Sequence, residues 1–187
     1  MRSLIAAAAD PSFPAEIVSV ISNVECAGGL VHAAEAGIAG KIIPHKPFPS
    51  REAFDAAIDA ALLDAEVEIV CLAGFMRILS DWFARKWEGR LLNIHPSLLP
   101  SFPGLEAWKQ ALNYGVKTTG CTVHFVDAGV DAGPVIGQQT VPVLDRDTPE
   151  TLHQRIQVAE HELYPKCVAA IARGGISVAG RRVIWKI

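Results

Sequence analysis

Short apolar runs alternate with helical patterns along most of the 187-residue chain. The run at residues 67–73 is almost wholly apolar and ends at Gly74, which is typical of a parallel strand covered on both faces. Strands are expected at residues 16–21, 38–43, 67–73, 90–94, 118–126 and 133–143, with a hairpin at 176–185. Helices are expected at residues 1–9, 29–36, 50–64, 80–86, 105–113 and 148–173. The alternation predicts a single α/β domain over residues 1–187, Rossmann-like, with a mostly parallel sheet and helices on both faces.

Composition excludes several classes of protein. Half of the residues are hydrophobic and a fifth are charged, which indicates a globular domain. The formal net charge is −3 and no basic cluster occurs, so nucleic acid and anionic membrane surfaces are not expected partners. The cysteines form no CxxC pair, which argues against a zinc site or a disulfide framework. The apolar run at residues 4–9 is too short to span a bilayer, and a cytoplasmic location is expected.

The end of the strand predicted at residues 90–94 carries polar side chains. Asn93 and His95 project from the same face, because strand side chains alternate. Pro96 and Pro100 stiffen the loop that follows. An amide and an imidazole at a strand's carboxyl end can donate hydrogen bonds to a developing oxyanion, and ligands bind at this edge of an open α/β sheet. The alternative, an Asn that closes a turn beside a half-exposed His, stays open on spacing alone.

Two further connections allow a similar choice. In the Gly-rich segment 126–134, Asp131 either faces His95 and favours its imidazolium form or is an ordinary loop residue. In segment 74–79, the apolar residues after Gly74 either line a slot for a flat ring or pack Phe75 and Leu79 into the core.

Three strings of residues together resemble a known family. They are Ala73-Gly74-Phe75-Met76-Arg77-Ile78-Leu79, Asn93-Ile94-His95-Pro96-Ser97-Leu98-Leu99-Pro100 and Asp131-Ala132-Gly133-Pro134. The chain resembles the phosphoribosylglycinamide formyltransferases over nearly its whole length. Pro103-Gly104 is similar to this branch, whereas the transfer-RNA branch of the superfamily typically carries Arg-Gly there.

The resemblance implies direct formyl transfer from 10-formyltetrahydrofolate, a cosubstrate, to the amine of glycinamide ribonucleotide, with no metal. It implies Asn93, His95 and Asp131 as catalytic residues. Its folate contacts map to Arg51, Met76, Arg77, Ile78, Leu79, Asn93, Asp127, Ala128, Gly129, Val130 and Asp131. Its substrate contacts map to Pro96 and Glu160. A monomer and a homodimer are both open.

The start of the chain departs from the family pattern. Members begin with an apolar strand and a Gly-Ser-rich loop that binds the substrate phosphate at a helix N-terminus. Residues 1–5 match the helix beyond that loop, so an N-terminally truncated domain is expected. The missing strand would lie between residues 16–21 and 67–73. We therefore expect either a gap between these two strands or another segment that fills it.

Rival functions follow from the same residues. A 10-formyltetrahydrofolate hydrolase would share the fold and the catalytic trio. A catalytically impaired folate-binding remnant is suggested by the missing phosphate loop. A dinucleotide-binding reductase is disfavoured, because no GxGxxG follows a predicted strand.

Overall fold

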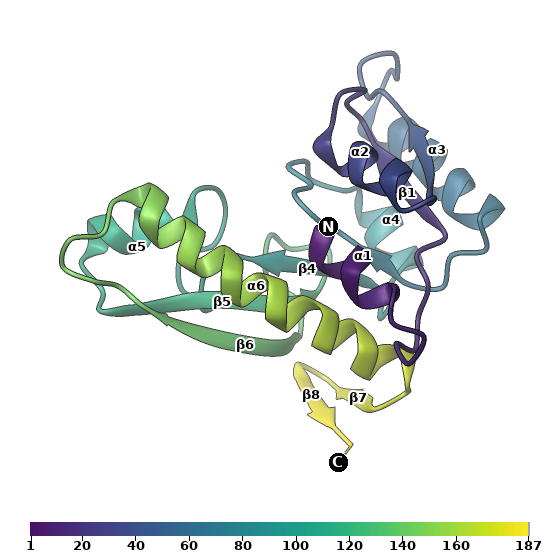
Figure 1. Cartoon of the computed structure of the whole chain (residues 1–187). Helices are drawn as coiled ribbons and strands as arrows, with labels where there is room; N and C mark the ends of the chain where they lie inside the picture. The colour runs from purple at the N-terminus through teal and green to yellow at the C-terminus, as the bar shows by residue number, and fades with distance from the viewer. Residues whose placement is uncertain (187) are drawn as a thin grey trace.

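The computed structural model describes residues 1–186 and has an α/β fold (Figure 1). The helices are α1 (Arg2–Ala8), α2 (Gly28–Glu35), α3 (Arg51–Asp64), α4 (Asp81–Lys86), α5 (Ala107–Tyr114) and α6 (Pro149–Ala172). The strands are β1 (Ser19–Ser22), β2 (Ala39–Ile42), β3 (Val70–Cys71), β4 (Leu91–His95), β5 (Thr118–Phe125), β6 (Val135–Pro142), β7 (Ile176–Ala179) and β8 (Arg182–Trp185). The predicted alternation of strands and helices is confirmed.

The strands form a two-stranded sheet, β1-β2, and a six-stranded sheet in the order β3-β4-β5-β6-β8-β7. β1 runs parallel to β2, β3 to β4, and β6 to β8. β5 is antiparallel to both of its neighbours, and β7 is antiparallel to β8. The expected α/β class with parallel strands is confirmed. Antiparallel pairing has a larger share than the segment order indicated, because residues 126–134 return β6 directly alongside β5 instead of crossing over through a helix.

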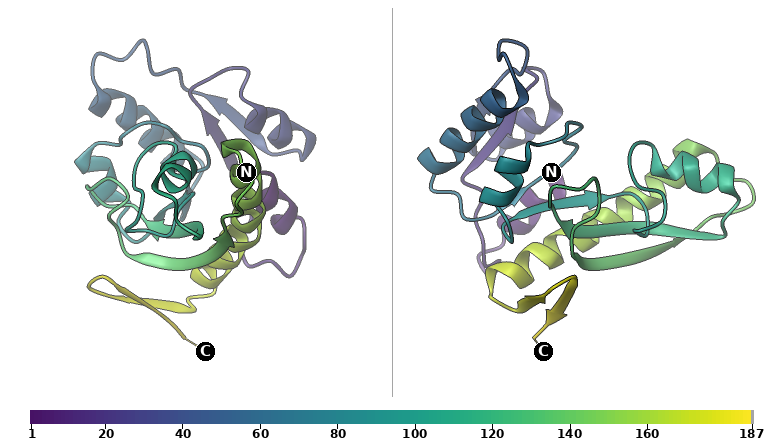
Figure 2. Two further views of the ribbon diagram at one scale, coloured as in Figure 1. Left: turned by 90° about the vertical axis from the view of Figure 1, so that its left-hand side faces the viewer. Right: turned by 180° about the vertical axis from the view of Figure 1, so that it is seen from behind.

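Helices cover both faces of the larger sheet, as predicted. Leu92 points into a core cluster with Leu4 of α1 and Tyr164 of α6. Its neighbour Leu91 points the other way, into a cluster with side chains of α3 and α4. Figures 1 and 2 show α6 lying along the β5–β6 arm with α1 beside it, while α3 and α4 belong to the other part of the molecule. β4 therefore lies between the two cores and contributes side chains to both.

β3 is shorter than the apolar run at residues 67–73 predicted, and β1 is shorter than residues 16–21. Within residues 1–186, β3 pairs only with β4, and β1 pairs only with β2. A cavity of about 450 Å³ lies between them, lined by residues of both strands such as Val20, Ile21, Val70 and Leu72. Among the described residues, each of these strands thus has a ladder on one side only and borders the cavity on the other. The expected gap between these strands is confirmed.

Local sequence signals set the ends of the helices that frame the site. The Ser50 hydroxyl accepts a hydrogen bond from the Ala53 backbone N–H and caps α3, as its position predicted. Thr148 caps α6 through a capping box with Thr151, and Pro149 occupies the first turn. None of the helices in residues 1–186 combines the length and apolarity needed to cross a membrane.

Candidate active site

Asn93 and His95 lie on one face of β4, at the carboxyl end of the strand. The antiparallel neighbour β5 places His124 opposite Asn93 and Thr122 opposite His95. The His95 side chain is almost wholly buried, with only 4% of the residue exposed. The alternative of a half-exposed strand-end His is therefore wrong.

Both ring nitrogens of His95 face acceptors. Nε2 lies 2.9 Å from the Phe102 carbonyl oxygen, and Nδ1 lies 3.3 Å from Oδ2 of Asp131. The expected proximity of Asp131 to His95 is confirmed, although the two residues lie on different elements.

The backbone around Asp131 is built to hold its carboxylate in place. Asp131 has a φ of 51°, in the left-handed region that aspartate tolerates better than most residues. Its Oδ2 also accepts a hydrogen bond of 2.8 Å from the Gly104 backbone N–H. At Gly133 a Cβ atom would overlap the Phe125 carbonyl oxygen, which explains why the turn after Asp131 carries glycine.

His124 joins the same cluster and was not among the predicted catalytic residues. Its Nδ1 lies 2.8 Å from the Phe125 carbonyl oxygen and must carry the proton. Nε2 is then an acceptor, 3.3 Å from Nδ2 of Asn93, and it lies 3.7 Å from Oδ1 of Asp131. Burial lowers the pKa of His124, although the Phe125 carbonyl and Asp131 oppose the shift. The neutral ring thus fixes which way the Asn93 amide points. The alternation of the predicted strand, in which His124 lies between Val123 and Phe125, indicated that His124 could face the site.

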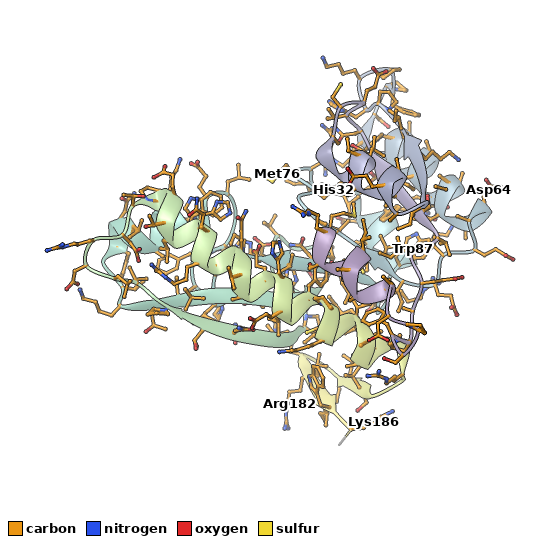
Figure 3. The ribbon with its side chains drawn as sticks, viewed as in Figure 1. His32, Asp64, Met76, Trp87, Arg182 and Lys186 are labelled. Carbon is orange, nitrogen blue, oxygen red and sulfur yellow. The ribbon has the colours of Figure 1, made fainter. Side chains whose placement is uncertain are left out.

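The loop from Gly74 to Leu79 packs on the core at its two ends and exposes apolar side chains between them; a slot for a flat ring stays a prediction. Phe75 and Leu79 pack against the core cluster of α3 and α4. Met76 and Ile78 are 72% and 61% exposed, and Met76 projects outward from the loop (Figure 3). Phe75 and Leu79 therefore anchor the loop, and the residues between them are exposed.

The second loop lies next to the first. Val126 packs on the same core cluster as Phe75. Beyond it, Asp127 accepts a 2.9 Å hydrogen bond from the Gly129 N–H, and Ala128, Gly129 and Val130 are exposed. The two segments, 74–79 and 126–131, therefore share one core cluster, and the second segment ends at Asp131 of the His95 cluster.

Two basic residues predicted for the folate also lie near this surface. Arg51 is exposed at the first position of α3. The Arg77 guanidinium stands over the ring of Phe54, 5.6 Å from its centroid, one turn along the same helix. Pro96 is half-buried directly after His95.

Glu160 does not join the His95 cluster. It lines a cavity of about 230 Å³ with Gly74, Ile94, His161 and Tyr164, and also Met1, Ser3 and Ala73. Ile94 points to the face of β4 opposite Asn93 and His95, so this cavity opens on the α6 side of the strand. Burial raises the pKa of Glu160 to about 7, an effect that the Met1 ammonium partly opposes.

Among residues 1–186, no three His, Cys, Asp or Glu side chains are grouped so that they could hold a metal ion.

The formyl transferase family model matches residues 1–168. The chain belongs to the formyl transferase family. It is 49% identical over 181 residues to phosphoribosylglycinamide formyltransferase of Mycobacterium tuberculosis, which covers 97% of this chain and 83% of that protein. It is 50% identical over 186 residues to bovine trifunctional purine biosynthetic protein adenosine-3, which covers 99% of this chain. The chain spans 18% of the length of that bovine relative.

Solved structures of this formyl transferase family share the fold. The chain superimposes on glycinamide ribonucleotide transformylase 1 from Symbiobacterium toebii with a TM-score of 0.96 and 46% identity, covering 98% of this chain and 87% of that one. Phosphoribosylglycinamide formyltransferase from Anaplasma phagocytophilum gives a TM-score of 0.92 at 42% identity, covering 100% of this chain and 88% of that one.

Proposed function

We propose that this chain transfers the formyl group of 10-formyltetrahydrofolate to the primary amine of glycinamide ribonucleotide, a step of purine synthesis. One observation carries the proposal: Asn93, His95, His124 and Asp131 form a connected cluster at the end of β4. The names of the relatives, which are glycinamide transformylases and purine-biosynthetic proteins, support the choice of substrates.

In the proposed reaction, the amine nitrogen attacks the formyl carbon, and negative charge develops on the formyl oxygen. The Phe102 carbonyl holds Nε2 of His95, so Nδ1 is the nitrogen that donates to this oxygen, and its N–H turns to it from the Asp131 carboxylate 3.3 Å away. One N–H of the Asn93 amide donates to Nε2 of His124, and the second donates to the formyl oxygen. Two aligned donors stabilise the tetrahedral intermediate.

Proton transfer completes the exchange of bonds. Once the neutral amine has formed the new C–N bond, its nitrogen is an ammonium and loses a proton to Asp131 through a bridging water. As the formyl C=O re-forms and the bond from the formyl carbon to the folate nitrogen breaks, Asp131 returns this proton, through the water, to the folate nitrogen. The Asp131 carboxylate is suited to this relay, because only 12% of its side chain is exposed and its Oδ2 lies near His95 Nδ1 and the Gly104 N–H.

The flanking loops are proposed to hold the folate. The exposed side chains of Met76, Ile78 and Val130 offer apolar contacts to a flat pterin ring. Arg51 and Arg77 supply positive charge for the folate carboxylates. The remaining proposed contacts are Leu79, Asn93, Asp127, Ala128, Gly129 and Asp131.

The nucleotide substrate is assigned to the other face of β4. We propose that Glu160, in its cavity of about 230 Å³, contacts the ribose, and that Pro96 borders the amine. The free cysteines Cys26, Cys71, Cys121 and Cys167 fit a reducing compartment, and a cytoplasmic location is proposed with the function.

A two-substrate assay tests the proposal. The chain is incubated with 10-formyltetrahydrofolate, with and without glycinamide ribonucleotide, and formylated nucleotide and formate are both quantified. Formylated product that depends on the amine supports the transferase. Formate release without the amine points to a hydrolase, and neither product, with folate binding retained in titration calorimetry, points to a folate-binding protein without this activity; either outcome overturns the proposal.

A further inference from the structure

The loop at residues 74–79 carries exposed apolar side chains and no regular secondary structure. It begins two residues after β3 and leads into Ser80, the N-cap of α4, whose hydroxyl accepts a hydrogen bond from the Phe83 N–H. The direction in which Met76 and Ile78 leave the loop depends on how these two ends are held. β3 is a two-residue strand, so much of that task falls to the Ser80 end.

Asp55 of α3 holds the Ser80 end. Its side chain is wholly buried, and Oδ2 accepts a short hydrogen bond of 2.6 Å from the Ser80 backbone N–H. Oδ1 is buried too and has no hydrogen-bond partner among residues 1–186. A buried carboxyl group with an unsatisfied oxygen is costly. The neighbours on this face of α3, Phe54 and Ile58, are apolar, so packing alone would favour a hydrophobic residue here.

Asp59, one turn further along α3, provides an internal comparison. Its Oδ2 binds Lys86 Nζ at 2.6 Å and its Oδ1 accepts a 3.0 Å hydrogen bond from Trp87 Nε1. The two carboxylates therefore form hydrogen bonds at opposite ends of α4. Asp59 joins α3 to the far end of α4, whereas Asp55 contacts the residue at which the loop ends.

We infer that Asp55 is a positioning residue for the loop at residues 74–79: its carboxylate fixes the Ser80 peptide and thereby the direction of the exposed loop side chains. Arg77 stacking on Phe54 gives the loop a second contact with α3, so one helix supports both the middle and the end of the loop. The effect on 10-formyltetrahydrofolate rests on the proposed function, whereas the effect on the order of the loop does not.

Native-state trypsin cleavage tests the positioning role directly, because Arg77 lies inside the loop. Asp55→Ala is expected to raise the rate of cleavage after Arg77 about tenfold, and Asp59→Ala to leave it within twofold. Asp55→Asn, whose amide oxygen can still accept from Ser80, is expected to fall near wild type. Cleavage after Arg155, within α6, reports global unfolding and corrects for lost stability.

Equal acceleration at Arg77 in the Asp55→Ala and Asp59→Ala proteins, or none in either, would overturn the inference. Should Asp55→Ala fail to fold, Asp55→Leu keeps the apolar packing without the acceptor and must show the same selective cleavage. Steady-state kinetics form the second arm: Asp55→Ala should raise KM for 10-formyltetrahydrofolate about tenfold, with kcat and KM for the amine within threefold. Selective cleavage with an unchanged folate KM would uphold the positioning role and count against the proposed folate site.

Discussion

His95 Nδ1 lies 3.3 Å from Oδ2 of Asp131, and the same oxygen accepts the Gly104 N–H at 2.8 Å. One carboxylate thus ties together the end of β4, the Pro-rich loop after it and the loop between β5 and β6. The contact joins these elements and, in the proposed reaction, places a negative charge beside His95. Substitution can separate these two roles.

Asp131→Asn removes the charge and keeps the shape. Asparagine tolerates the left-handed backbone at this position, and its amide oxygen can still accept from Gly104. We expect kcat to fall about 10²–10³-fold, as for the loss of an oxyanion donor, with the unfolding midpoint in urea nearly unchanged. Turnover within tenfold of wild type would show that the charge on Asp131 does not drive the reaction.

Asn93→Ala should also lower kcat about 10²–10³-fold, because the amide is assigned as a direct donor to the oxyanion. KM for both substrates should change far less than kcat, since the interaction forms mainly in the transition state. Stopped-flow single-turnover measurements separate chemistry from product release. Near-full turnover by this variant contradicts the role of Asn93.

His124→Phe tests the orientation of Asn93. The ring keeps its volume in the core but loses the acceptor at Nε2, which leaves the Asn93 amide free to flip. Loss of one hydrogen bond of about 1–1.5 kcal/mol corresponds to roughly a tenfold fall in kcat. The double variant with Asn93→Ala is the control: if His124 acts through Asn93, it adds no further loss to Asn93→Ala alone.

Local patterns predicted the parts of this site that depend on neighbouring residues. Alternation in a strand placed Asn93 and His95 on one face, and Ser50 correctly marked the start of α3. The contact between Asp131 and His95 joins positions far apart in the chain, so spacing left it open and the family resemblance was needed to select it. His124 was seen to be able to face the site, but its role depends on the register of β4 against β5.

Local sequence patterns could not predict features that depend on contacts between distant parts of the chain. An apolar run such as residues 67–73 reports burial, not hydrogen-bond partners, and β3 formed only where β4 supplies them. The Phe102 carbonyl reaches His95 because Phe102 has a φ of 54°, a conformation that its residue type does not suggest. Asp55 and Asp59 look like polar positions of an amphipathic helix until the packing of α4 against α3 is known.

Gly133→Ala should disturb Asp131 without touching any reacting group. The added methyl would overlap the Phe125 carbonyl oxygen, so the turn must shift, at a cost of about 1–3 kcal/mol for overpacking. We expect both a lower urea midpoint and a lower kcat. Gly28→Ala is a useful comparison, because the added methyl at Gly28 would meet no atom within 4 Å. Equal, small effects of the two substitutions would rule out a special steric need at position 133.

Burial of Glu160 makes the free energy of unfolding fall as the pH rises. Burial raises the pKa of Glu160 in the folded chain to about 7 from its usual value of 4.5, so the folded state favours the protonated form. The resulting stabilisation is fully present below pH 4.5 and is lost as the pH rises through 7. The full loss is at most about 3 kcal/mol, from 1.36 kcal/mol per pKa unit. Glu160→Gln stays neutral throughout and should lack this loss.

Urea unfolding at pH 5, 6, 7 and 8 measures the difference. Glu160→Gln should gain stability relative to wild type as the pH rises, with most of the change between pH 5 and 7. Glu162→Gln is the matched control, since Glu162 lies two residues away on α6 and is exposed; its profile should run parallel to that of wild type. If the Glu160→Gln profile is also parallel to wild type, Glu160 ionises in the folded chain as it does in the unfolded one. The carboxyl group in this cavity would then meet the nucleotide as an anion at neutral pH, an acceptor only, whereas the raised pKa leaves a protonated fraction that can also donate to a ribose hydroxyl.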